Sequence, residues 1–323
     1  MIKKFLYYTW YYYIPICLMV VLVLLINNFI LDELNETNEL KKCEKFNQYQ
    51  EGCLNLFKNI RYPNKSRIHI PPLRYIPNDL LAEFTQNGQI PIRKWLYINE
   101  AYLDSNLDKI YNRDLAIITK EDVKFWQDAV KKRLPLNYGD KFMTQLMFKY
   151  DKQVKDKSVA VIGTQSVWIE AIALEVGAAK VTTLEYTRKE YEDKEKLEWI
   201  HVNDYLDKIL HSSSDNKLEQ FDSIASYSSI EHSGLGRYGD PLDGLGDIKA
   251  VRQIHCMTKP GGLLFLGLPT TKPLYATSYI EFNLHRVYGF NRLKYLFDGW
   301  EILEQSEQSN NHNVFVLKKL SVC

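Results

Sequence analysis

The stretch from Phe221 to Pro269 decides the fold. It begins FDSIASYSSIEHSGLG (221–236), continues through a loop rich in Gly and Asp, and ends IKAVRQIHCMTKPGGLLFLGLP (248–269). This order predicts a buried strand, a polar loop, an amphipathic helix, a Pro-Gly-Gly turn and a second buried strand. Such a series is typical of a parallel sheet in a doubly wound α/β domain. Ligands of these sheets bind at the carboxyl ends of the strands, where this chain places Ser228, Glu231 and His232.

The same pattern extends on both sides of this stretch. Apolar runs bounded by turn residues predict seven strands, and the last two can return as a hairpin. The expected strands are 158–162, 180–185, 199–202, 222–227, 262–268, 300–304 and 314–317. The expected helices are 119–134, 140–150, 167–176, 204–210, 247–257 and a long one at 281–297. Thr119 and Asp122 have the spacing of a capping box at the start of the first helix.

The overall composition excludes some classes of partner. The formal net charge is +1 and charged residues make up 25% of the chain, so no global field would attract nucleic acid. None of the 5 cysteines has the spacing of a zinc site, and no metal is expected. Cys43 and Cys53 lie close together in the sequence and could pair in an oxidising compartment.

The N-terminal segment predicts a membrane anchor. No charged residue occurs from Phe5 to Leu31, which is long enough to cross a bilayer. Lys3 and Lys4 precede it and acidic residues follow, so the positive-inside rule places the rest of the chain in the lumen. A cleaved signal peptide is the alternative, but no small residue that would suit cleavage lies nearby. Two glycosylation sequons follow, at Asn35 and Asn64.

Two residues near the first predicted strand indicate a nucleoside site. The turn VIGTQSVW (161–168) follows this strand, and Gly163 lets the backbone approach a ligand, with Thr164 and Gln165 beside it. Glu185 closes the second strand, where a carboxylate accepts hydrogen bonds from ribose hydroxyls. The 22 residues between Gly163 and Glu185 agree with the separation of about 20 in such sites.

These residues carry a resemblance to a known family. Residues 159–320 resemble the class I S-adenosylmethionine-dependent methyltransferases, through VAVIG, GAAKVTTLEY, FDSIASYSSIEH, MTKPGGLLFLGLP and GWEILEQ. More narrowly, VIGTQSVWIEA, SSIEHSGLGRYGDPLDGLGD and LHRVYGFNRL are similar to the nematode family catalogued as domain of unknown function 268. The resemblance implies S-adenosylmethionine as cofactor, bound by Gly163, Thr164, Gln165, Glu185 and Ser228. One motif departs from the methyltransferase pattern, because a valine, Val161, replaces the usual acid and only one glycine remains in the turn.

Glu231 and His232 allow three interpretations. His232 could take a proton from an acceptor hydroxyl, the pair could border the nucleoside, or His232 could hydrogen-bond the backbone of its loop. The Gly-rich loop that follows is long enough to be functional. Its residues Arg237, Tyr238 and Asp240 are candidates for binding an acceptor, and so is His285 further along the chain.

Together these features predict a division of the chain and a function. Residues 1–6 form a cytosolic tail, 7–31 a signal anchor, 32–62 a stem, 63–150 a helical and extended cap, and 151–323 a Rossmann-like domain. The expected function is methyl transfer to a hydroxyl or carboxyl of a glycan or small molecule in the secretory pathway. The alternatives are a non-catalytic binding module that retains the fold and, less favoured, a glycosyltransferase, because no Asp-x-Asp pair is present.

Overall fold

The computed structural model describes residues 52–53, 55–57, 74–95, 116–185, 188–211, 221–238 and 240–320. The expected signal anchor, most of the stem, Cys43 and both sequons, Asn35 and Asn64, lie outside these residues. Within the described ranges, none of the helices combines the length and apolar character needed to cross a bilayer.

A central sheet of seven strands organises the domain, as the sequence predicts. Its strand order is β11-β12-β8-β7-β3-β4-β6. The strands are β3 (Ser158–Ile162), β4 (Lys180–Leu184), β6 (Leu197–Ile200), β7 (Phe221–Tyr227), β8 (Thr258–Pro269), β11 (Trp300–Gln305) and β12 (His312–Lys319). All neighbouring pairs are parallel except those of β12, which is antiparallel to both β8 and β11. The late hairpin is therefore confirmed.

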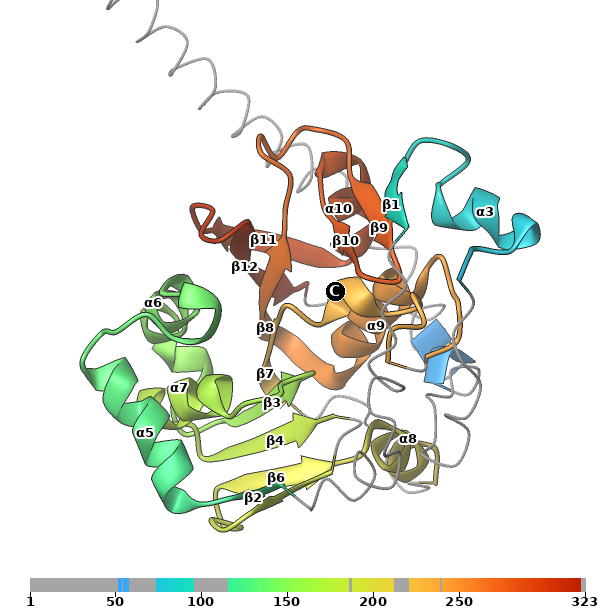
Figure 1. Cartoon of the computed structure of the whole chain (residues 1–323). Coiled ribbons are helices and arrows are strands. Elements are labelled where there is room, and N and C mark those ends of the chain that lie inside the picture. The colour runs from blue at the N-terminus through green and yellow to red at the C-terminus, as the bar shows by residue number, and fades with distance from the viewer. Residues whose placement is uncertain are drawn as a thin grey trace, which may run out of the picture.

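Helices cover both faces of the sheet (Figure 1). The helices α5 (Lys120–Lys131), α6 (Phe142–Lys149) and α7 (Trp168–Val176) share one core with Val159 and Val161 of β3. The helices α8 (Val202–His211), α9 (Gly246–Met257) and α10 (Phe290–Leu296) share the other core, which includes Ala160 of the same strand. This alternation along β3 is the reason that the strand is apolar throughout.

The direction of chain winding reverses beside β3. This strand pairs with β4 on one side and with β7 on the other, so the chain proceeds through β4 and β6 and then returns to build β7 and β8. The turns that follow β3 and β7 consequently meet at the carboxyl edge of the sheet. In open α/β sheets this reversal is the usual ligand position.

The start of one helix and the end of another lie where the sequence signals place them. Thr119 caps α5 by accepting a hydrogen bond from the Asp122 amide, and the Asp122 side chain accepts from the Thr119 amide, so the capping box is confirmed. Helix α7 ends at Gly177, whose φ of 105° is in the left-handed region that glycine tolerates.

The prediction of one long helix over residues 281–297 is wrong. The chain instead forms strands β9 (Tyr279–Phe282) and β10 (His285–Val287), and only α10 of that segment is helical. Strand β9 pairs with β10 and with β1 (Ile92–Trp95), which lies far away in the sequence. Ile280 and Phe282 of β9 pack with Phe84 of α3 (Asn78–Phe84) and with Leu235 in a separate small core. A further pair, β2 (Ala116–Ile118) and β5 (Lys189–Tyr191), is parallel.

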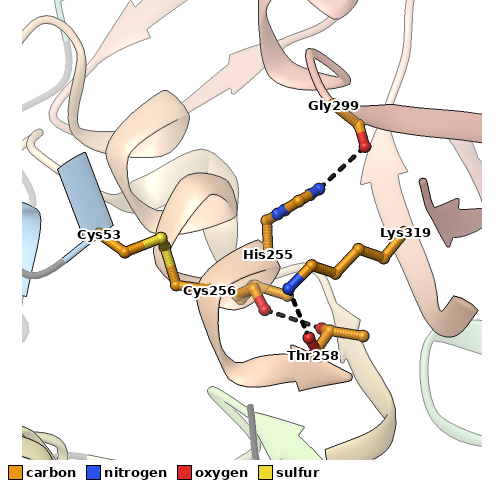
Figure 2. Close-up of a disulfide and its surroundings, with 7 residues drawn as sticks. Cys53, His255, Cys256, Thr258, Gly299 and Lys319 are labelled. Carbon is orange, nitrogen blue, oxygen red and sulfur yellow. Dashed lines mark hydrogen bonds between the residues drawn. A yellow bond between two sulfur atoms is a disulfide. The ribbon is translucent and has the colours of Figure 1, made fainter. Parts of the chain in front are cut away.

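A disulfide joins Cys53 to Cys256, 203 residues apart (Figure 2). The suggested pairing of Cys43 with Cys53 is therefore wrong, because Cys53 bonds to α9. Both cysteines are buried, at 5% and 2% exposure. Next to Cys256, His255 bonds the Gly299 carbonyl, and the Lys319 ammonium donates to the Thr258 carbonyl at 2.7 Å. Sequence spacing alone cannot show such a bond, since it depends on where the N-terminal segment packs.

Candidate functional site

Three loops meet at Gly163, the residue that follows β3. Its φ is 66°, and its amide donates to the Leu184 carbonyl at 3.2 Å. A Cβ atom built at this position would overlap the hydroxyl of Ser229, which follows β7, and would lie 4.0 Å from Oε2 of Glu185, which follows β4. The predicted pair Gly163 and Glu185 therefore lies together, with Ser229 directly over the glycine.

The rest of this turn is held by its own side chains. Thr164 is buried and its hydroxyl donates to the Ser166 carbonyl. Gln165 is exposed, but its carbonyl accepts a hydrogen bond of 2.8 Å from the buried ammonium of Lys189. These contacts fix a turn that has few glycines.

Ser228 links two titratable groups at the end of β7. Its φ of 50° is unusual for a serine. Its hydroxyl lies 2.7 Å from Oε1 of Glu231 and 3.2 Å from Nε2 of His312. Glu231 is 1% exposed, and its Oε2 has no hydrogen-bond partner among the described residues. Burial raises the pKa of Glu231 to about 7.

His232 is a neutral imidazole in this environment. Its Nδ1 lies 2.5 Å from the Leu284 carbonyl, which can only accept, so Nδ1 carries the proton. Burial, followed by the charge of Arg237, lowers the pKa of His232 to about 3. Its Nε2 lies 3.7 Å from Oε1 of Glu231, and because the ring is uncharged this contact is not an ion pair at neutral pH.

Three predicted acceptor residues gather around His232. Arg237 donates to the same Leu284 carbonyl at 3.3 Å, and the Tyr238 ring meets the His232 ring edge-on at 5.4 Å. The His285 ring lies 6.3 Å from that of His232, and its Nε2 is 3.4 Å from a carboxylate oxygen of Glu281. The structure thus brings the loop and β10 together on one side of Glu231.

Asp240 is oriented differently. Its carboxylate accepts hydrogen bonds from the backbone amides of Gly234, Gly236 and Tyr238, at 2.6, 3.3 and 3.3 Å. Gly234 and Gly236 have φ of 78° and 76°. Asp240 is therefore the residue around which the Gly-rich loop folds.

A buried cluster of charged side chains holds the backbone of the Gly-rich loop. Asp247 accepts from the Arg292 Nε at 3.0 Å and from the Tyr288 hydroxyl at 3.0 Å. The Nε of Arg286 lies 3.6 Å from Asp247, and its guanidinium donates to the Ser233 and Asp243 carbonyls at 2.5 and 3.1 Å. All four side chains of the cluster are buried. It connects α9 and α10 to the loop that carries Arg237.

Sequence reasoning missed an aromatic group beside Ser228. The ring of Tyr227 stacks on His312, with centroids 5.1 Å apart, and on Tyr138, at 5.5 Å. Tyr138 belongs to a single 3₁₀ turn between α5 and α6 and is 46% exposed. His312 is the first residue of β12, and no local pattern marks it, because its role depends on an antiparallel strand arriving at this edge.

This arrangement fits the ribose of the implied cofactor better than the part of the cofactor that would lie on the turn at Gly163. Glu185 stands beside Gly163 at the winding reversal, which suits the ribose of a nucleoside. Over Gly163 itself the Ser229 hydroxyl fills the space, so a ligand that lies on the turn requires Ser229 to move. In the described part of the chain, no group of three His, Cys, Asp or Glu residues could hold a metal ion.

Solved structures with a similar fold include two that are named methyltransferases. The 1,6-didemethyltoxoflavin-N1-methyltransferase of Burkholderia thailandensis, solved with 1,6-didemethyltoxoflavin and S-adenosylhomocysteine, is 13% identical, with a TM-score of 0.41 over 62% of this chain and 85% of its own. The N-methyltransferase NodS of Bradyrhizobium japonicum, solved with S-adenosylhomocysteine, is 11% identical, with a TM-score of 0.35 over 60% and 98%. TehB of Haemophilus influenzae is 14% identical, with a TM-score of 0.39 over 60% and 67%. These scores are low, and the assignment of the fold rests on the strand order above.

Among curated proteins no match is found. One family model, described as "Caenorhabditis protein of unknown function, DUF268", matches residues 156–321, which is just over half of the chain and contains β3 to β12 with Gly163, Glu185, Ser228 and Glu231. The chain therefore belongs to the DUF268 family.

Proposed function

We propose that this protein is a membrane-anchored, lumenal methyltransferase-like protein that binds S-adenosylmethionine at the edge between β3, β4 and β7. Its acceptor is a hydroxyl or carboxyl of a glycan or small molecule. The observation that carries the proposal is the position of Glu185 beside Gly163 at the reversal of chain winding. A carboxylate at the end of the second strand of such a sheet suits the two hydroxyls of a ribose.

The side chains around Glu231 suit proton transfer. The group best able to accept a proton near neutral pH is Glu231, with a pKa of about 7, because His232 with a pKa of about 3 is a weak base. His232 then orients the site through its contacts with Leu284 and Tyr238. Arg237 and His285 lie on the same side and are the residues we assign to the acceptor. When bound, S-adenosylmethionine supplies the methyl group.

A second candidate function is binding without chemistry. The contact of Ser229 with Gly163 and the loss of further glycines from the turn favour it, since both restrict the space beside the nucleoside. This candidate retains the role of Glu185 but predicts that no acceptor is methylated.

The buried disulfide supports the lumenal location. Disulfides persist in oxidising compartments and are rare in the cytosol. The bond between Cys53 and Cys256 agrees with the predicted anchor orientation and with the sequons at Asn35 and Asn64, because each is expected of a chain whose residues after the anchor are lumenal.

Calorimetric titration of the full chain in detergent with S-adenosylmethionine and S-adenosylhomocysteine tests the proposal. We expect a Kd in the micromolar range, and Glu185→Gln should weaken binding about 10-fold or more, equivalent to roughly 1.4 kcal/mol for one lost charged hydrogen bond. The matched control is Glu190→Gln, because Glu190 lies on β5 and its carboxylate pairs with Lys194 at 3.2 Å within the described part of the chain.

Equal binding by the wild type and Glu185→Gln would refute the assigned role of Glu185. No binding up to about 1 mM, where the free energy is only about −4 kcal/mol, would refute the cofactor itself. Binding without methyl transfer to any lumenal acceptor would favour the second candidate.

A further inference from the structure

The Ser228 hydroxyl has contacts on both sides that constrain its proton. It lies 2.7 Å from Glu231 Oε1 and 3.2 Å from His312 Nε2, and a hydroxyl has a single hydrogen to donate. On the far side of the imidazole, His312 Nδ1 lies 2.9 Å from the Asn310 carbonyl. Because a carbonyl only accepts, Nδ1 of His312 carries a proton in every state that retains this bond.

When Glu231 and His312 share one proton, only two arrangements satisfy all three hydrogen bonds. In one, a protonated Glu231 donates to Ser228 and Ser228 donates to the bare Nε2 of a neutral His312. In the other, a protonated His312 donates to Ser228 and Ser228 donates to an ionised Glu231. Both contain one shared proton, and they interconvert when that proton passes through the Ser228 hydroxyl.

We propose that Glu231, Ser228 and His312 form a proton relay, which removes the proton of an acceptor hydroxyl bound against Glu231 Oε2 and delivers it to solvent through His312. This inference rests on the proposed function. In the state with ionised Glu231, the acceptor O–H bond breaks and its proton binds Oε2. His312 then loses its Nε2 proton to water, and Ser228 turns to donate to the bare Nε2. Rotation of the Glu231 carboxyl brings the bound proton to the side of Ser228, and its passage through the Ser228 hydroxyl to Nε2 restores ionised Glu231. One proton therefore moves from acceptor to solvent in each cycle, and only O–H and N–H bonds change.

The accessibility of the three residues agrees with this direction of transfer. Glu231 is 1% exposed, and its Oε2 lacks a partner within the described residues, whereas Ser228 and His312 are partly exposed and Asn310 is exposed. The buried end of the relay is thus the end beside Arg237, one of the candidate acceptor residues. The exposed end lies beside the rings of Tyr227 and Tyr138.

The relay narrows the class of acceptor to hydroxyls. A carboxyl acceptor loses its proton near pH 4 and is already ionised at neutral pH, so it needs no base. An ionised carboxylate would also be repelled by ionised Glu231. A hydroxyl, in contrast, retains its proton until a base removes it.

Other charged and titratable groups lie close to both Glu231 and His312, the two ends of the relay. Glu231 faces the cationic groups of Arg237 and Arg286 and the neutral ring of His232, and Tyr227 and Tyr288 are close enough to interact with it. His312 faces His285, Tyr138 and Tyr227. The test therefore follows His312 itself rather than overall activity.

Nitrogen NMR of the full chain in detergent, labelled with ¹⁵N-histidine, tests the relay, and the variant His312→Asn identifies the His312 signals. We expect the neutral ring to carry its proton on Nδ1. Glu231→Gln should lower the midpoint of His312 protonation by roughly one pH unit, because a negative partner is removed. Ser228→Ala should lower it as well, and Ser233→Ala, a later serine of the same loop, should leave it unchanged.

A neutral ring protonated on Nε2 would overturn the relay, as would an unchanged His312 midpoint in Glu231→Gln or, if that variant does not fold, in Ser228→Ala. The result is independent of cofactor binding. If the NMR results support the relay but the chain binds no S-adenosylmethionine, only the proposed function is contradicted. If the chain binds S-adenosylmethionine but the His312 midpoint does not respond, only the relay is contradicted.

Discussion

Gly163 shows how one residue determines the geometry of the site. Its φ of 66° favours glycine, and the missing side chain leaves room for Ser229. The variant Gly163→Ala combines left-handed strain of about 1–2 kcal/mol with a steric overlap of about 1–3 kcal/mol. We expect a loss of unfolding free energy of about 2–5 kcal/mol, measured by denaturant unfolding of the full chain.

Two further variants separate strain from overlap. Gly261 has a φ of 72° and open space where a Cβ would lie, so Gly261→Ala reports strain alone. Adding Ser229→Gly to Gly163→Ala should recover the part of the unfolding free energy that is lost to steric overlap with Ser229. If Gly163→Ala costs no more than Gly261→Ala, Ser229 does not press on the turn.

For individual residues, the sequence predicts a position at the site wherever that position depends only on the strand that the residue follows. Glu185 and Gly163 each end a strand, and the parallel arrangement brings them together. Ser228 and Glu231 are found for the same reason. His312 and Ser229 are missed, because the contact of each depends on a neighbouring loop or strand whose register cannot be read from a single sequence.

At the scale of elements, the buried cluster around Asp247 connects α9, β10 and α10. Burial alone would raise the pKa of Asp247, but the charges of Arg286 and Arg292 outweigh it, and the pKa lies below its usual value. A carboxyl with a lowered folded-state pKa stabilises the protein above its unfolded pKa of about 4. That stability is lost as the pH falls below about 4 and through the folded pKa.

The variant Asp247→Asn tests this connection. It leaves two buried guanidinium groups without their carboxylate, so we expect a loss of about 3–5 kcal/mol at pH 7 and a weaker acid dependence of stability than in the wild type. Unfolding curves between pH 3 and pH 7, roughly the range in which carboxyls titrate, provide the measurement. The control Glu301→Gln removes an exposed partner of Lys318 at 3.8 Å and should cost under about 1 kcal/mol. Equal costs for both variants would show that the cluster does not hold these elements together.

Most elements could be predicted, and the main error has a physical cause. Strands of the large sheet are buried on both faces and read as continuous apolar runs. The sequence predicts a helix over residues 281–297, but the segment 279–287 is not helical. It forms strands because β1, almost 190 residues earlier, supplies a pairing partner and a small core for Ile280 and Phe282. Local periodicity carries no information on that partner.

At the scale of the whole molecule, the disulfide attaches the segment that follows the predicted anchor to the main domain. Cys53 comes 22 residues after Leu31, and Cys256 lies in α9, which also carries Asp247. The proposed membrane anchor thereby gains a second, shorter covalent connection to α9, the helix that supports the Gly-rich loop. The position of the domain relative to the membrane would depend on this bond.

The double variant Cys53→Ser/Cys256→Ser tests both the stability and the location. The bond closes a loop of 203 residues, and its loss should reduce the unfolding free energy by about 2–5 kcal/mol. The full chain isolated from cells with free thiols blocked should show the bond by mass spectrometry of the linked peptides, as expected of an oxidising lumen. The control Cys17→Ser, within the predicted anchor, should leave that linked pair and the stability unchanged. Reduced Cys53 and Cys256 in such a preparation would contradict the lumenal location, and an unchanged stability in the double variant would contradict the structural role of the bond.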